Sequence, residues 1–141
     1  EGTNGIQAID LVGRKLMDGG EAAFRLIDEM QADAESARAT HPDLAEPLWQ
    51  ATETLREATE WMVAQEMGAR LPGASAYLHG FARVLGAQAH LRAAMAEPEG
   101  APARLAAVYM TRLLPEHASA LAEAREGGKA VEAITAEDLA A

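Results

Sequence analysis

Apolar residues recur every three or four positions along most of this chain, which is the spacing of a helix that buries one face. No segment alternates apolar and polar residues in the manner of a strand. Glycines and prolines interrupt the pattern and mark the ends of the helices. The predicted helices span about residues 5–17, 21–39, 43–70, 74–96 and 103–126.

The starts of the first two predicted helices carry residues suited to cap them. Asn4 precedes the first helix, and Gln7 stands three positions later, as in a capping box. Asp18 follows that helix and is predicted to cap the second one, with Glu21 in the matching position. Each pair would satisfy backbone N–H groups that have no partner inside the helix.

Other boundaries depend on residues that interrupt a helix. Pro72 ends the third predicted helix, and Pro115 falls inside the last one, which it should kink or divide. Near the end of the chain, Thr135 and Asp138 have the spacing of a capping pair. They predict a short terminal helix or turn over residues 137–141.

Long helices joined by short loops pack as antiparallel neighbours. We therefore predict an all-α protein, an up-and-down antiparallel bundle of about four to five helices. Asp10 and Arg14 lie four residues apart and should form an ion pair. The positions expected to face the core are Ile6, Ile9, Val12, Gly13 and Leu16 in the first helix; Phe24, Ile27, Met30, Ala34 and Ala37 in the second; Leu44, Leu48, Ala51, Leu55, Ala58, Met62, Gln65 and Ala69 in the third; and Tyr77, Phe81, Val84, Leu85, Gln88, Leu91 and Met95 in the fourth.

The charge of the 141-residue chain limits its partners. Its formal net charge is −10 and its pI is near 4.8. Nucleic acids and anionic membrane surfaces are bound through basic residues, so neither is an expected partner. The phosphates of CoA and of a flavin dinucleotide are anionic as well, and this domain alone is a poor candidate to hold them.

Composition adds two further limits. The chain has no cysteine, which excludes disulfides and thiolate nucleophiles and suits the reducing cytosol, so a cytoplasmic location is expected. No apolar run has the length of a membrane span. Apolar residues make up 49% of the chain but aromatic residues only 4%, which favours closely packed helices over strands.

The chain opens with Glu1-Gly2-Thr3-Asn4-Gly5-Ile6-Gln7 and continues to Gly13-Arg14-Lys15-Leu16. The opening resembles the motif Glu-Gly-Thr-x-x-Ile-Gln of the acyl-CoA dehydrogenase family, near the end of that family's catalytic helical domain. The longer run is similar to a branch with an additional C-terminal helical domain, which includes the methylmercaptopropionyl-CoA dehydrogenases. The specific resemblance covers residues 1 to about 20.

This resemblance implies an FAD-dependent oxidoreductase of fatty acid metabolism that dehydrogenates an acyl-CoA thioester between its α and β carbons. Glu1 would be the catalytic base that removes the α-proton, while a hydride passes from the β carbon to FAD. A carboxylate performs such a step when desolvation raises its pKa toward neutrality. Thr3, Asn4, Gly5 and Gln7 would lie beside the flavin, although Gln7 fits its capping role equally well.

The chain starts inside this motif and without Met, so we expect it to be a piece of a larger protein. Residues 1–17 would end the catalytic region, and residues 18–141 would form the additional bundle. The piece alone should be inactive and should not retain FAD. The implied partners are the acyl-CoA substrate, the rest of the dehydrogenase chain and further copies in a homo-oligomer. The alternative is a non-catalytic helical interaction module, in which the first residues serve only as a cap.

Four other residues, two histidines and two tryptophans, are candidates for metal binding or for contacts with a partner. His79 and His90 lie eleven residues apart, about three helical turns, and so face the same way. Bundles that hold two metal ions use Glu-x-x-His on two helices, which the sequence lacks, so no metal site is predicted. Trp49 and Trp61 lie beside the predicted core face of their helix. They would either flank the core or contact another domain or subunit.

Overall fold

The computed structural model describes residues 3–140, and every regular element within that range is helical. The predicted all-α fold is therefore confirmed for these residues. The first helix continues into a π-helical turn, η1 (Leu11–Lys15). The α-helices are α1 (Thr3–Asp10), α2 (Glu21–Ala37), α3 (Pro42–Ala64), α4 (Met67–Arg70), α5 (Ala74–Ala96), α6 (Ala101–Arg112), α7 (Glu116–Glu126) and α8 (Lys129–Glu132).

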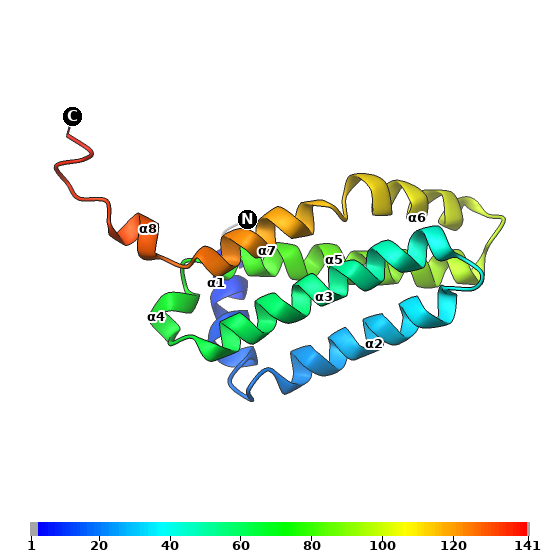
Figure 1. Ribbon diagram of the computed structural model, residues 1–141, viewed down its shortest axis with the longest axis horizontal. Helices are drawn as coiled ribbons and strands as arrows, with labels where there is room; N and C mark the ends of the chain where they lie inside the picture. Colours follow the sequence, from blue (N-terminus) through cyan, green and yellow to red (C-terminus); the bar gives the residue numbers. More distant parts are fainter. Residues whose placement is uncertain (1–2, 141) are drawn as a thin grey trace.

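Helices α2, α3, α5 and the pair α6–α7 lie side by side and alternate in direction, as an up-and-down bundle does (Figure 1). Helix α5 is central, because it packs against α2, α3, α6 and α7. The α1–η1 segment crosses one end of the bundle and contacts α5 (Figure 1). At the same end, α8 and the residues after it extend away from the bundle (Figure 1).

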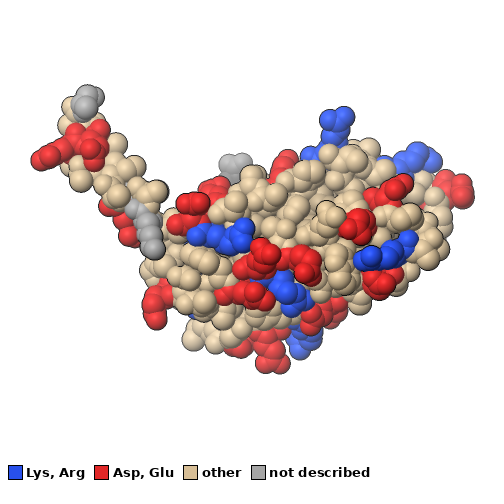
Figure 2. All heavy atoms as spheres, in the orientation of Figure 1, with Lys and Arg blue, Asp and Glu red and all other residues tan. Residues whose placement is uncertain are grey.

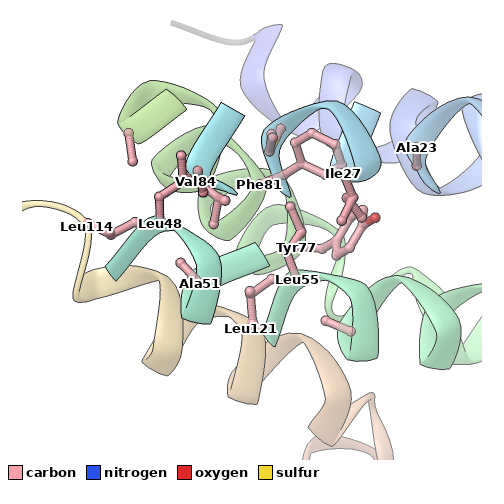
Figure 3. Close-up of a cluster of buried hydrophobic side chains, with 14 of the residues drawn as sticks. Ala23, Ile27, Leu48, Ala51, Leu55, Tyr77, Phe81, Val84, Leu114 and Leu121 are labelled. Atoms are coloured by element: carbon pink, nitrogen blue, oxygen red, sulfur yellow. The ribbon is translucent and has the colours of Figure 1, made fainter. Parts of the chain in front are cut away.

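The core lies between α2, α3, α5 and α7 (Figure 3). It consists mainly of Ala and Leu side chains. Small residues allow the helices to approach closely. At Gly80 in α5, an added Cβ would lie 2.5 Å from a methyl carbon of Leu121 in α7, so the two helices are in direct contact there. The rings of Tyr77 and Phe81 meet edge to face, with their centroids 5.9 Å apart.

Four positions predicted to face the core are exposed instead. Ile6 and Ile9 are 66% and 54% exposed, because the α1–η1 segment buries the narrow side that carries Ala8, Val12 and Leu16. The bundle covers only one side of a segment that crosses its end, so part of the segment's apolar surface remains exposed. The other two positions are Leu85, on the outer side of α5, and Met95, in the last turn of α5, which are both partly exposed.

The third predicted helix is shorter than expected. We predicted a helix to residue 70, but α3 ends at Ala64, Gln65 has an extended backbone with ψ at 152°, and α4 begins only at Met67. Residues 64–67, where the break falls, contain neither glycine nor proline. The side chain of Arg70 turns back and donates hydrogen bonds to backbone carbonyls at the end of α3, which stabilises the interruption.

Several predicted boundaries are confirmed. The Asp18 carboxylate accepts hydrogen bonds from the backbone N–H groups of Gly20 and Ala22, at 2.8 and 3.1 Å, and so satisfies one N–H group in the first turn of α2. The N-cap position itself is Gly20, and Glu21 is the first residue of α2, so the predicted pairing of Asp18 with Glu21 in a capping box is wrong. Pro115 divides the last long helix, since α6 ends at Arg112 and α7 begins at Glu116. Asn4, by contrast, lies inside α1, which begins at Thr3, so the prediction that it precedes the helix is wrong.

The predicted capping pair near the end of the chain is also confirmed. The Asp138 carboxylate accepts a hydrogen bond from the backbone N–H of Thr135 at 2.9 Å, and the Thr135 hydroxyl accepts one from the backbone N–H of Asp138 at 3.3 Å. Hydrogen bonds from Thr135 lower the pKa of the Asp138 carboxyl. These contacts close a turn over residues 136–139, while Ala141 lies outside the described residues.

Candidate functional site

The predicted site residues fall at the start of the α1–η1 segment. Glu1, the predicted base, and Gly2 lie outside the described residues. The predicted flavin neighbours Thr3, Asn4, Gly5 and Gln7 occupy the first turns of α1 and are exposed to solvent.

The apolar side of the segment fixes where these residues lie. Ala8, Val12 and Leu16 are buried and join the core, and α1 contacts α5. This attachment presents the first turn of α1 at the end of the bundle (Figure 1). The polar residues of that turn are exposed to solvent. The first backbone N–H groups of a helix have no intrahelical acceptor, so this end of α1 can donate hydrogen bonds to a ligand.

One hollow adjoins the predicted site. It has a volume of about 520 Å³, lies between the start of α1 and the first half of α5, and is lined by Asn4, Ser75, Leu78, His79 and Ala82. Of the described predicted site residues, Asn4 alone contributes to it. Sequence reasoning missed Ser75 and Leu78, whose positions on α5 gave no indication that α1 would cross beside them.

His79 belongs to a cluster of polar side chains at the edge of this hollow. Its Nε2 atom lies 3.4 Å from a carboxylate oxygen of Glu116, and the same oxygen accepts hydrogen bonds from Arg83. The Glu116 hydrogen bond is the largest cause that raises the pKa of Arg83. The cluster joins α5 to the first turn of α7.

A second hollow, of about 500 Å³, lies between η1, the end of α3 and α4. Gly13 and Met17 line one side, and Val63, Met67 and Arg70 line the other. The Arg70 guanidinium bridges the two sides, because it donates one hydrogen bond to the Val12 carbonyl and two to carbonyls at the end of α3. Arg70 was also missed from the sequence, where it is one basic residue near a helix end.

The predicted ion pair between Asp10 and Arg14 is confirmed and is bidentate, with N–O distances of 2.5 and 2.9 Å. The hydrogen bond from Arg14 is the largest cause that lowers the pKa of Asp10, and the reciprocal bond raises the pKa of Arg14. A lowered pKa makes a carboxylate a weaker base, whereas a general base at neutral pH needs a pKa raised toward neutrality. Asp10 therefore orders the helix surface.

Charged side chains of both signs are interspersed over the visible face of the molecule, with acidic residues the more numerous (Figure 2). Many of them form pairs between helices, such as Arg56 with Asp28 and Arg125 with Glu57. Exposed pairs of this kind add little stability, typically about 0–1 kcal/mol each. This face has the character of a solvated surface.

The four residues weighed separately in the sequence have structural contacts. The His90 ring stacks on Tyr109, with centroids 4.5 Å apart, and no group of three potential metal ligands occurs among the described residues. Trp49 is half-buried against the core beneath the guanidinium of Arg38, which lies 5.3 Å from its ring. Trp61 is also half-buried against the core. Both tryptophans therefore flank the core.

No helix among residues 3–140 is both long enough and apolar enough to cross a membrane.

Comparison with known proteins relates the chain to a family of dehydrogenase domains. A family model described as acetyl-CoA dehydrogenase C-terminal like matches residues 26–135, from within α2 to beyond α8. The matched range is more than half of the chain and excludes the α1–η1 segment. Curated proteins give no significant match. The chain belongs to the acetyl-CoA dehydrogenase C-terminal-like family.

Proposed function

We propose that this chain is the C-terminal segment of an FAD-dependent acyl-CoA dehydrogenase. The observation that carries the proposal is the family match over residues 26–135, preceded by the dehydrogenase-like motif in residues 1–7. Residues 1–17 end the catalytic region, and residues 18–141 form the additional helical bundle. The start of the family match at residue 26 supports this boundary, because the match covers the bundle and leaves the motif outside.

In the proposed reaction, Glu1 removes the α-proton of an acyl-CoA thioester. FAD, when bound, accepts the hydride that leaves the β carbon. The exposed first turns of α1 fit one edge of such a cofactor, because the Thr3, Asn4 and Gln7 side chains and free backbone N–H groups offer hydrogen bonds. Gly5 leaves open space, since an added Cβ there would meet no heavy atom within 4 Å.

The bundle itself has a structural role in this proposal. Each of its buried polar side chains, Thr52, Thr59 and Gln88, forms a hydrogen bond within the bundle, and the net charge of the chain opposes the binding of anionic cofactors. We propose that the bundle docks on the catalytic region of a cytoplasmic homo-oligomer. The 141-residue chain alone is then inactive and purifies without FAD. Purification with stoichiometric flavin would contradict this part of the proposal.

The test of the catalytic role is Glu1→Gln in the full-length dehydrogenase, assayed with a panel of acyl-CoA substrates. General base catalysis contributes about 10²- to 10⁴-fold, so flavin content should be unchanged and turnover should fall by at least this factor. Glu21→Gln, in the exposed first turn of α2, is the matched control and should retain full turnover. Near-normal turnover of Glu1→Gln would remove Glu1 from the mechanism.

One observation favours a second candidate, a non-catalytic helical interaction module. The family match excludes the first 25 residues. It therefore supports the presence of the helical bundle without supporting the motif in residues 1–7. The two candidates differ in the region that precedes Glu1 in the parent gene. A flavin-binding dehydrogenase region that ends in Tyr supports the enzyme, whereas an unrelated preceding region supports the module. The same sequence would test the proposed likeness to the methylmercaptopropionyl-CoA branch.

A further inference from the structure

The C-terminal ends of two helical segments converge on the side chain of Arg70. Its Nε donates a hydrogen bond to the Gln65 carbonyl at 2.8 Å, and Nη2 donates one to the Val63 carbonyl at 2.9 Å, both at the end of α3. Its Nη1 donates to the Val12 carbonyl at 3.2 Å, in η1. Residues 12 and 70 are thus joined across 58 positions of the chain.

The acceptors are carbonyls that a helix end leaves without a partner. In η1 the backbone N–H of Leu16 donates to Leu11 and that of Met17 donates to Arg14, so neither of these N–H groups serves Val12. Carbonyls at the end of a helix also carry the negative end of its dipole, which attracts a cation. One guanidinium therefore satisfies two converging helix ends.

Apart from the hydrogen bond of Arg70, η1 and α4 make few contacts. A hollow of about 500 Å³ separates much of η1 from the end of α3, and an added Cβ at Gly13 would lie 3.6 Å from the Met67 side chain. On the other side, the buried face of the segment packs on α5. The hydrogen bond from Arg70 is thus a polar attachment of the α1–η1 segment, in addition to its apolar packing on α5. The two attachments together fix the rotation of the segment about its axis.

We propose that Arg70 is a positioning residue that fixes the orientation of the α1–η1 segment, and so of the first turns of α1, where the proposed flavin neighbours lie. The catalytic half of this inference rests on the proposed function. Helix α1 runs without a break from Thr3 into η1, so a displacement at Val12 is carried to the start of the helix. Arg70 acts through the segment and contacts no reacting atom.

The first experiment uses the 141-residue chain and backbone hydrogen exchange. Arg70→Lys keeps the charge but replaces the planar fork, and Arg70→Met keeps the stem without any donor. Exchange over residues 8–17 should become about tenfold faster or more, with Met above Lys, while residues 84–91 of α5 keep their rates. Arg104→Lys, on the exposed side of α6, is the control and should change neither region. Unchanged exchange over residues 8–17 would overturn the proposal.

The second experiment uses the full-length dehydrogenase. Arg70→Lys should lower kcat by about 10- to 100-fold with KM within about twofold, because a small misplacement of a catalytic group costs rate more than binding. The isotope effect with an α-deuterated substrate should rise, and Arg104→Lys should behave as wild type. Faster exchange with an unchanged kcat would overturn the positioning role alone. Full turnover of Glu1→Gln would instead refute the proposed function and leave Arg70 as an anchor of the segment.

Discussion

The hydroxyl oxygens of Tyr77 and Thr59 lie 2.7 Å apart at the centre of the bundle, where both side chains are fully buried. The Thr59 hydroxyl also lies 2.7 Å from the Leu55 carbonyl, one turn earlier in α3. A threonine hydroxyl has one proton, and the carbonyl can only accept, so Thr59 donates to Leu55 and Tyr77 donates to Thr59. This chain of hydrogen bonds joins α5 to α3 and gives the interior a fixed direction of donation.

The direction predicts an asymmetry between two substitutions. Thr59→Val removes the acceptor of a buried phenol and should lower the free energy of unfolding by about 1–3 kcal/mol. Tyr77→Phe leaves the Thr59 donor satisfied by Leu55 and should cost less, about 0.5–1.5 kcal/mol. Denaturant unfolding of both variants and of the double variant measures the difference. An equal cost for the two single variants would refute the assigned direction.

The same phenol predicts a loss of stability in alkali. Burial raises the pKa of Tyr77 to about 12, against an ordinary value of 10.0. Below pH 10 both the folded and unfolded states hold the proton, so this contribution is fully present. Between pH 10 and 12 the unfolded state alone loses the proton, and the free energy of unfolding falls by about 2–3 kcal/mol. Tyr77→Phe should show a smaller fall over this window when wild type and variant are unfolded in parallel.

Close contact between α5 and α7 predicts an intolerant glycine. An added Cβ at Gly73 would lie 2.3 Å from the backbone carbonyl oxygen of Ala124, and a backbone atom cannot move aside as a flexible side chain can. Gly73→Ala should therefore lower the free energy of unfolding by about 1–3 kcal/mol. Gly13→Ala is the control, because its Cβ would meet Met67 at an ordinary 3.6 Å. Thermal unfolding of the two variants separates the two effects, and equal midpoints would contradict the close contact.

Gln88, the third buried polar residue, shares a hydrogen-bond acceptor with an exposed residue, and the loss of either contact should have a different cost. The Asp33 carboxylate accepts hydrogen bonds from the buried Gln88 amide and from the exposed Arg92 guanidinium, both at 2.6 Å. Asp33→Ala leaves the Gln88 amide without this acceptor and should cost about 1–3 kcal/mol. Arg92→Ala removes only an exposed pair and should cost below about 1 kcal/mol. Asp33→Asn, which keeps an acceptor oxygen, should fall between them when all three are unfolded by denaturant.

Helical periodicity was sufficient to predict most of the bundle, because each long helix buries one side. Ile27 and Met30 in α2, and Leu48 and Leu55 in α3, are buried as their spacing predicts. The pattern failed for the α1–η1 segment, where Ile6 and Ile9 have the same spacing as buried residues but lie outside. Periodicity predicts that a helix has an apolar side. How much of that side is buried depends on where the α1–η1 segment crosses the end of the bundle.

The break after α3 shows a second limit of the sequence. Residues 64–67 contain no proline, and hydrogen bonds from Arg70, which is five residues beyond Gln65, stabilise the interruption. Such a contact is set by the three-dimensional path of the chain. The catalytic role of the motif in residues 1–7 stays a prediction, because Glu1 lies outside the described residues. The contacts that attach the α1–η1 segment to the bundle depend on the fold and could not be predicted from the sequence.

The contacts of Arg70 respond differently to acid than the surface ion pairs do. Its three acceptors are backbone carbonyls, which do not titrate in water, and among residues 3–140 no carboxylate lies within ion-pair distance of it. Acidification protonates surface carboxylates and weakens the ion pairs that they form. The Arg70 contacts between the α1–η1 segment and the bundle contain no carboxylate that acid could protonate. They therefore persist in mild acid that weakens the surface ion pairs.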